Sequence, residues 1–292
     1  MALTGVDMAS MKQRRVTGLP GVIALGLALR RARMARGVGL RRLADQLGIH
    51  AGLVSAWEYA LRVPSVTDVA RLLGFLRVKR DEYQQIMNLC QDATRLTLVE
   101  PTSNILPPLL WHYETTATKV VVWSPALIPD AFRTVEYTRT LLNNGLLLED
   151  EIDQRSLARA ARPDAMIGHP GKYLLLLGEP ALSSVATSRQ IMIDQLRYLE
   201  KLSEHPRITV HIVRGDATVN FVTPFSVFES AKGAVTTIVH QNFHGIVYEA
   251  SPQYVARHQA TAEALRQASA TEADSKRLVA ATIERMQRCQ EP

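Results

Sequence analysis

The chain is poor in cysteine and has no long apolar run. Two of its 292 residues are cysteine, and Cys90 and Cys289 are too far apart in sequence to resemble a metal-binding pair. We therefore expect two reduced thiols in a cytoplasmic protein, and no cofactor. No segment approaches the roughly 20 apolar residues of a membrane-spanning helix, so the sequence predicts no membrane association.

Short patterns that mark common enzyme sites are also absent. The sequence has no G-x-S-x-G nucleophile elbow, no G-x-x-x-x-G-K-[ST] phosphate loop and no dinucleotide-binding glycine motif. His240 and His244 have a spacing found at zinc sites, but the strand end and turn expected there do not align two rings as a helix would. We therefore expect no enzymatic activity, no catalytic residue and no metal ion.

Acidic residues are missing from Met8 to Ala44, a stretch that holds nine basic residues. Residues 1–100 carry 15 Lys or Arg against 8 Asp or Glu, whereas residues 101–292 carry 19 against 20. The net charge of +6 therefore comes from the N-terminal third of the chain. Such an asymmetry predicts a polyanion-binding surface on an otherwise balanced protein.

The apolar run 16–29 follows two arginines, which is superficially similar to a twin-arginine export signal. Pro20 interrupts this run early, and Arg30 and Arg31 stand where small residues would mark a cleavage site. We therefore expect the run to belong to the folded protein in the cytoplasm.

Composition and periodicity divide the chain into four parts, in a fold class of α plus α/β. A disordered basic tail is expected over 1–18, and five short helices over 19–97. Prolines without periodicity predict a linker over 98–108. A mixed α/β domain with C-terminal helices is expected over 109–292. Its strands, about five in number, are expected at 173–177, 208–213, 225–229, 235–240 and 245–249.

The densest pattern lies at residues 40–65. It predicts a helix, a tight turn at Gly48 and a second helix that ends before Pro64. Two helices joined this closely cross at a steep angle, which requires a small residue on the first helix and a branched apolar residue on the second. Ala44 and Val54 supply this pair. The segment therefore has the composition of a helix-turn-helix.

The sequence 29–65 resembles the Xre/Cro-type helix-turn-helix family. The matching residues are Leu29, Arg30, Arg33, Gly37, Leu43, Ala44, Leu47, Gly48, Ile49, Val54, Ser55, Trp57, Glu58, Arg62, Pro64 and Ser65. This resemblance implies sequence-specific binding of double-stranded DNA, usually by a homodimer on a two-fold site.

The second helix of the pattern is expected to enter the major groove, while arginines around it bind phosphates. The expected DNA-binding residues are Arg30, Arg31, Arg33, Arg41, Arg42, His50, Ala51, Gly52, Ser55, Ala56, Tyr59 and Arg62. Leu40 replaces a glutamine that often contacts DNA in the family, and Leu53 also stands where a polar residue is usual. Specificity is thus expected from Ser55, from methyl contacts to thymine and from DNA shape. The alternative is a helix-turn-helix that has lost tight readout and binds proteins.

Residues 110–288 resemble a domain of unknown function that follows Xre-type domains in actinobacterial regulators, the WhiJ-like, antitoxin-like group. The resemblance includes Leu127-Ile128-Pro129, Leu176-Leu177-x-Glu179-x-x-Leu182, Phe225-Ser226-Val227-Phe228 and Val247-Tyr248-Glu249. It implies a transcriptional repressor or activator whose second domain dimerises and binds a small partner protein or a small-molecule effector. The alternative is an antitoxin-like protein that mainly binds a small partner.

A ligand or partner site in this domain would be expected at polar and aromatic residues of the matching segments. These are Tyr137, Glu179, Gln195, Phe225, Tyr248 and Glu249. The alternative for each of them is a packing or capping role. The segment 130–134 departs from the Gly-Leu-Leu-Gln-Thr usual in the family, so any specificity that it carries is expected to differ.

Overall fold

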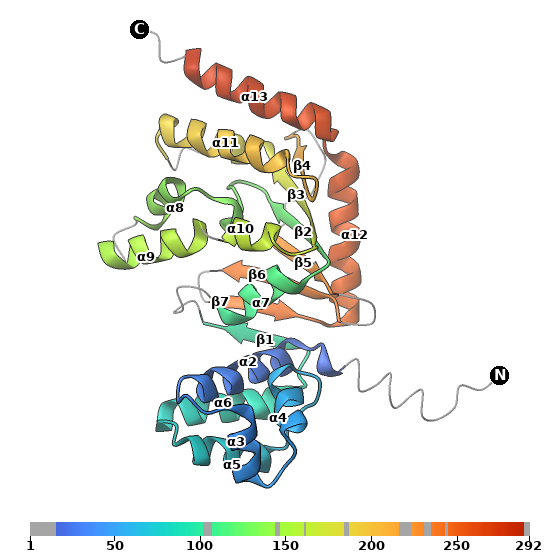
Figure 1. The fold of residues 1–292 in the computed structure, drawn as a ribbon. Coiled ribbons are helices and arrows are strands. Elements are labelled where there is room, and N and C mark those ends of the chain that lie inside the picture. The colour runs from blue at the N-terminus through green and yellow to red at the C-terminus, as the bar shows by residue number, and fades with distance from the viewer. Residues whose placement is uncertain are drawn as a thin grey trace, which may run out of the picture.

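In the computed structural model, short helices at the N-terminal end lie beside the edge of a mixed sheet that carries the other helices on its two faces (Figure 1). The described residues are 16–101, 107–143, 147–160, 162–183, 187–215, 223–230, 235–242 and 245–288. Most of the tail expected at 1–18 lies outside them. Among the described residues, no helix has both the length and the apolar character needed to cross a membrane.

The expected N-terminal helices are confirmed. They are α2 (Pro20–Met34), α3 (Leu40–Leu47), α4 (Ala51–Glu58), α5 (Val66–Leu76) and α6 (Arg80–Asp92). Pro20 starts α2, a position where its missing N–H costs no hydrogen bond. Ser65 caps α5 by accepting a 3.1 Å hydrogen bond from the backbone N–H of Asp68. Local signals in the sequence thus determine where α2 and α5 begin.

The sheet has more strands than the sequence predicts. Its strands are β1 (Thr97–Glu100), β2 (Lys119–Ser124), β3 (Lys172–Gly178), β4 (Ile208–Val213), β5 (Phe225–Glu229), β6 (Thr237–Asn242) and β7 (Gly245–Glu249). They are arranged in the order β1-β7-β6-β5-β2-β3-β4, with β2, β3 and β4 parallel and the other neighbours antiparallel. The mixed sheet is therefore confirmed, and the described part of the chain gives it seven strands rather than about five.

Strand β1 corrects the expectation that residues 98–108 lack regular structure. Leu98 pairs with Tyr248 and Glu100 pairs with Ile246 of β7, so the first residues of this segment form one edge of the sheet. Residues 102–106 lie outside the described residues. The N-terminal helices are therefore joined to the sheet by backbone hydrogen bonds soon after α6 ends.

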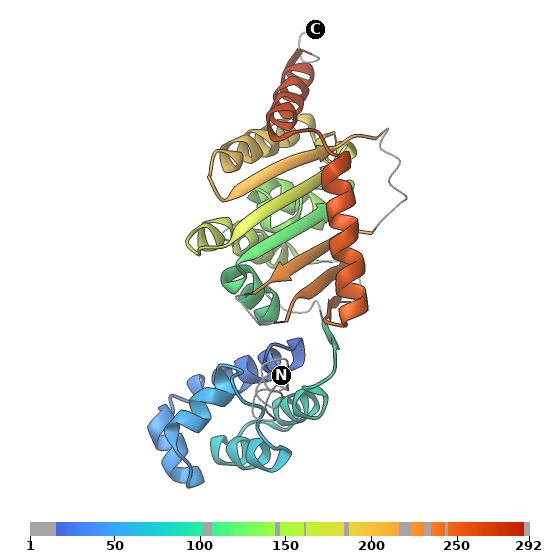
Figure 2. The same ribbon diagram turned by 90° about the vertical axis from the view of Figure 1, so that its right-hand side faces the viewer.

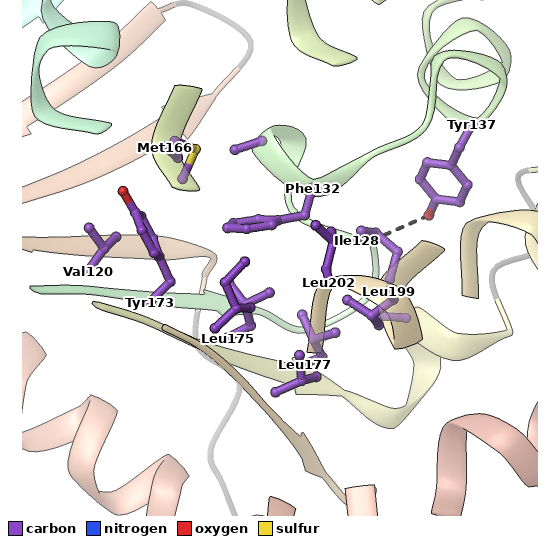
Figure 3. Packing of buried hydrophobic residues seen from close by; sticks show 14 of the residues in the cluster. Val120, Ile128, Phe132, Tyr137, Met166, Tyr173, Leu175, Leu177, Leu199 and Leu202 are labelled. Carbon is purple, nitrogen blue, oxygen red and sulfur yellow. Dashed lines mark hydrogen bonds between the residues drawn. The ribbon is translucent and has the colours of Figure 1, made fainter. Parts of the chain in front are cut away.

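Helices cover both faces of the sheet (Figure 2). They are α7 (Pro108–Thr116), η1 (Asp130–Phe132), α8 (Val135–Leu142), α9 (Glu149–Ala160), α10 (Arg162–Ile167), η2 (Glu179–Leu182), α11 (Arg189–Ser203), α12 (Pro252–Ala268) and α13 (Glu272–Arg288). Helix α12 buries Ala262 and Leu265 against one face, where Trp123 also packs. The larger core lies on the other face, where Phe132 and Leu199 pack on strand residues such as Leu175 (Figure 3).

Helix α2 contributes to two cores. Its residues Val22, Leu25 and Leu29 are buried among the N-terminal helices. On another side of the same helix, Ala24 and Leu27 pack against the core of the sheet part. Any shift of α2 therefore changes the packing of both parts.

Candidate nucleic-acid interface

Helices α3 and α4 form the helix-turn-helix predicted from the sequence. Gly48 ends α3 with a left-handed backbone (φ of 67°), and the backbone N–H of Ile49 donates to the carbonyl of Ala44 at 3.0 Å. Ala44 and Val54 are both fully buried in the same core, as their proposed role at the helix crossing requires. The position of α4 relative to α3 is thus determined by residues of the motif itself.

Helix α4 buries one side and presents the other. Val54, Trp57 and Glu58 face the core. The residues expected to contact DNA bases lie on the outer face of α4 and at its C-terminal end, where they are exposed or half-exposed. They are Ala51, Gly52, Ser55, Ala56 and Tyr59. His50 precedes the helix, and its Nδ1 accepts a 3.1 Å hydrogen bond from the backbone N–H of Gly52, so this side chain caps the helix. Ser55 is left as the hydroxyl-bearing side chain in the middle of the face.

Arg33 does not lie on this face, which corrects the expectation that it binds phosphate. Its guanidinium donates to both carboxylate oxygens of Glu58, at 2.6 and 2.8 Å, and to the carbonyl of Val38 at 2.8 Å. The Glu58 side chain is 1% exposed, and its hydrogen bond raises the pKa of Arg33. Two hydrogen bonds between a guanidinium and a buried carboxylate fix geometry as well as charge. Arg33 therefore holds α4 against α2.

Arg30 and Arg31 point to different sides of α2. The Arg30 guanidinium lies 5.1 Å from the ring centroid of Tyr59, beside the C-terminal end of α4. Arg31 instead lines a cavity together with α6 and β1, away from α4. Arg30 therefore keeps its expected place beside the interface, whereas the structure corrects the expected place of Arg31.

The start of α3 is electropositive. No side chain caps this helix, and its first turn has no acidic residue. Arg41 and Arg42 are exposed there, although basic residues at this end oppose the helix dipole. Free backbone N–H groups together with two guanidinium groups are suited to bind a phosphate. Arg62, exposed just beyond α4, extends the basic rim of the outer face.

A glycine allows α2 to approach α4 closely. A Cβ atom at Gly26 would lie 2.7 Å from the Trp57 carbonyl oxygen and 2.9 Å from that of Glu58. We expect Gly26→Ala to lower the free energy of unfolding by about 1–3 kcal/mol, because backbone atoms of α4 would have to move. Urea unfolding followed by circular dichroism measures this loss.

Gly74→Ala is the matched control for Gly26→Ala. Gly74 also lies within a helix, and a Cβ atom there meets nothing within 4 Å. Its replacement should raise stability by up to about 1 kcal/mol through helix propensity alone. A similar gain in both variants would contradict the close approach of α2 to α4.

Comparison with protein families supports the division of the chain seen in the fold. Residues 24–85 match the model of a helix-turn-helix domain. Residues 108–281 match the model of a domain of unknown function, DUF5753. The chain belongs to the DUF5753 family. No curated protein and no solved structure matches it. The helix-turn-helix identifies a DNA-binding regulator.

Two residues expected at a ligand site of the DUF5753 domain are instead part of its core. The Gln195 amide accepts a 2.7 Å hydrogen bond from the backbone N–H of Thr134 and donates one of 3.0 Å to the carbonyl of Phe132. The hydroxyl of the buried Tyr137 accepts from the backbone N–H of Ile128 at 3.4 Å (Figure 3). Both side chains therefore support the segment around η1.

The other four residues expected at a ligand site do not lie together with Tyr137 and Gln195. Glu179 is exposed after β3, and Phe225 is buried under α12, with its ring 5.0 Å from that of His258. Glu249 accepts from the Thr97 hydroxyl at 2.6 Å and from the backbone N–H of Ser251 at 2.6 Å. Tyr248 is buried between β1 and α7. The structure thus corrects the expectation that these residues share a site.

The DUF5753 domain contains a buried charged network that the sequence does not predict. Arg162 binds the carboxylate of Glu114 through two nitrogens and that of Asp130 through a third. Arg159 and Arg133 also donate to Asp130, at 2.8 and 3.3 Å. Four of these residues lie on α7, η1, α9 and α10, and Arg133 directly follows η1. Only the tertiary structure brings them together. No pattern in the sequence indicates this network.

His240, one of the two histidines with zinc-like spacing, lies beside a histidine of α12. Its ring lies 5.0 Å from that of His258 on α12, while His244 lies outside the described residues. Among the residues that the structure describes, no three His, Cys, Asp or Glu side chains converge as metal ligands would.

Proposed function

We propose that this chain is an Xre-type transcriptional regulator that binds a two-fold DNA site as a homodimer in the cytoplasm, without enzymatic activity. The observation that carries the proposal is the outer face of α4. It is exposed, free of acidic side chains and bordered by Arg30, Arg41, Arg42 and Arg62. In this function α4 enters the major groove while the basic rim binds the phosphates on both sides of it.

The outer face of α4 favours shape and methyl contacts over hydrogen bonds. Ser55 can read a base edge through its hydroxyl, whereas Ala51 and Ala56 can contact only thymine methyl groups. A face of this kind predicts that deformable or narrow-grooved sequences contribute to specificity. The proposed dimer would place two copies of α4 about 34 Å apart on the duplex.

Selection of bound sequences from random duplexes tests the proposal. The wild-type chain should enrich a palindrome, and Ser55→Ala should blur one position in each half-site while leaving the others unchanged, since one direct contact is lost in each copy. Ser183→Ala, at an exposed serine of the DUF5753 domain, is the control and should return the wild-type palindrome. If the wild-type chain enriches no sequence, the proposed function is wrong.

A second candidate function, an antitoxin-like protein that mainly binds a small partner protein, is favoured by one observation. Leu148 and Leu157, at the start of α9 and on it, are 74% and 63% exposed. Contiguous exposed apolar patches mark protein–protein interaction sites, and in this function the two leucines would belong to such a patch. In this function, a small protein should co-purify stoichiometrically with the wild-type chain and be lost from Leu148→Glu/Leu157→Glu. The same wild-type chain should select no DNA sequence. These results together would establish this function instead.

A further inference from the structure

A cavity of about 540 Å³ lies where α2 and α6 meet the edge of the sheet. Its apolar walls include Leu27 of α2, Leu89 of α6, Leu98 of β1 and Leu109 of α7. Cavities of this size bind small organic molecules and are common between domains. This one is separate from the outer face of α4.

The charged groups that line the cavity are mostly acidic. Arg31 is accompanied there by Glu82, Asp92 and Glu100. Glu82 is paired with Arg36 at 2.7 Å and Asp92 with Arg95 at 2.9 Å, so neither carboxylate is free of a cation.

Glu100 has a different environment. Its carboxylate accepts a 2.5 Å hydrogen bond from the Tyr248 hydroxyl and another from the backbone of Leu109, and within the described part of the chain no cation lies within ion-pair distance of it. Burial raises the pKa of this carboxyl group. Both hydrogen-bond donors are neutral, and the charge of Arg31 acts on Glu100 only from beyond ion-pair distance. Glu100 can therefore pair directly with a cationic group of a ligand in the cavity.

Helix α2 connects the cavity to the DNA-binding face. Leu27 and Ala28 line the cavity, and on the same helix Arg33 holds Glu58 of α4. Gly26 brings the backbone of α2 against that of α4. On the opposite wall, Glu100 is fixed to the sheet through its pairing with β7. A molecule in the cavity thus contacts both the sheet and the helix that positions α4.

We infer that this cavity is an effector site for a small organic amine with an apolar body, and that its occupancy changes the affinity for DNA. The apolar body packs against the leucines, while the ammonium group pairs with the Glu100 carboxylate that Tyr248 orients. An anionic ligand would instead place a second negative charge beside the Glu100 carboxylate, which disfavours it. The regulatory part of this inference rests on the proposed function.

Calorimetric titration of the full chain with three probes of equal size tests the ligand class. The probes are phenylbutylamine, phenylbutanol and phenylbutyrate. The amine should bind at least about tenfold more tightly than the alcohol or the acid, because only the amine forms a charge-assisted pair with Glu100. Equal affinities for the three probes would overturn the inference.

Two variants locate the binding. Glu100→Gln keeps an acceptor for Tyr248 but removes the charge, and should weaken amine binding about tenfold. Gln85→Trp fills the cavity from an exposed position on α6 and should abolish binding of every probe. Glu284→Gln, at an exposed carboxylate on α13, is the control and should bind like the wild type. Unchanged amine binding in the first two variants would also overturn the inference.

DNA binding tests the regulatory part. Saturating amine should change the wild-type Kd for the selected duplex at least about fivefold and leave that of Glu100→Gln unchanged. By linkage, the duplex should change the affinity for the amine by the same factor. Amine binding without any effect on DNA overturns the regulatory role. A chain that binds no DNA even without amine contradicts the proposed function, while calorimetry still decides on the cavity.

Discussion

Replacing Arg162 by Met should lower the free energy of unfolding of the DUF5753 domain by roughly 3–5 kcal/mol. The Arg162 side chain is 2% exposed, and it contacts Glu114, which is 4% exposed, and Asp130, which is 12% exposed. Methionine fills a similar volume but leaves the Glu114 carboxylate without the guanidinium that binds it, whereas Asp130 keeps Arg159 and Arg133. An uncompensated charge in a dry interior is among the most destabilising changes that one substitution can make.

The loss should depend on pH. Burial raises the pKa of the Glu114 carboxyl even in the wild type, where the charge of Arg162 opposes the rise. Without Arg162 this pKa rises further in the folded state, so protonation favours folding of the variant. The stability of Arg162→Met should therefore be closest to that of the wild type below the ordinary carboxyl pKa. It should fall further behind as pH rises through the raised pKa of Glu114. Urea unfolding at several pH values between about 4 and 7 measures this dependence.

Two further variants show whether the buried charges are responsible. Arg162→Met/Glu114→Gln should recover part of the lost stability at neutral pH, because it removes the Glu114 charge that loses its guanidinium partner. Arg266→Met removes an arginine that is also paired with a glutamate, but on the exposed surface of α12, and should leave the urea midpoint unchanged. Equal losses in Arg162→Met and Arg266→Met would mean that Arg162 contributes no more than a surface arginine.

The α3–α4 unit could be predicted because the residues that determine it are close in sequence. Gly48 supplies the left-handed turn, and Ala44 and Val54 supply the helix contact. Strand β1 could not be predicted in the same way. Thr97–Glu100 is short and precedes a proline, and its hydrogen-bond partners come from β7, much later in the chain. Local pattern thus determines the motif, whereas the sheet edge depends on distant pairing.

The roles of individual arginines were harder to predict than their location. Charge pattern groups Arg30, Arg31 and Arg33 together, but neighbouring residues of a helix project about 100° apart. One therefore lies beside Tyr59, one lines a cavity and one binds the buried Glu58. The carboxylate that selects Arg33 comes from a different helix, so only the tertiary structure separates a phosphate-binding arginine from a structural one.

A steep dependence on salt is expected for DNA binding. Of the expected DNA-binding arginines, all within the described part of the chain, Arg30, Arg41, Arg42 and Arg62 keep a place at the outer face of α4. If both copies in a dimer use all of them, log K should fall with log salt with a slope of about −7. Between 50 and 200 mM salt, affinity should then fall by roughly four orders of magnitude. Fluorescence anisotropy with the selected duplex measures this slope.

Arg41→Ala/Arg42→Ala tests whether the start of α3, rather than the total positive charge of the chain, binds the DNA phosphates. It should reduce the slope to about −4, because two phosphate contacts disappear from each half-site. Base preference should stay the same, since phosphate contacts position the protein without reading sequence. Arg285→Ala/Arg288→Ala removes two exposed arginines from α13 instead, and should leave the slope near its wild-type value. If this second pair reduces the slope as much as the first, α3 does not bind the backbone of DNA. The polyanion would then be held by the summed charge of the whole chain, and the asymmetry between its two parts would have no role in binding.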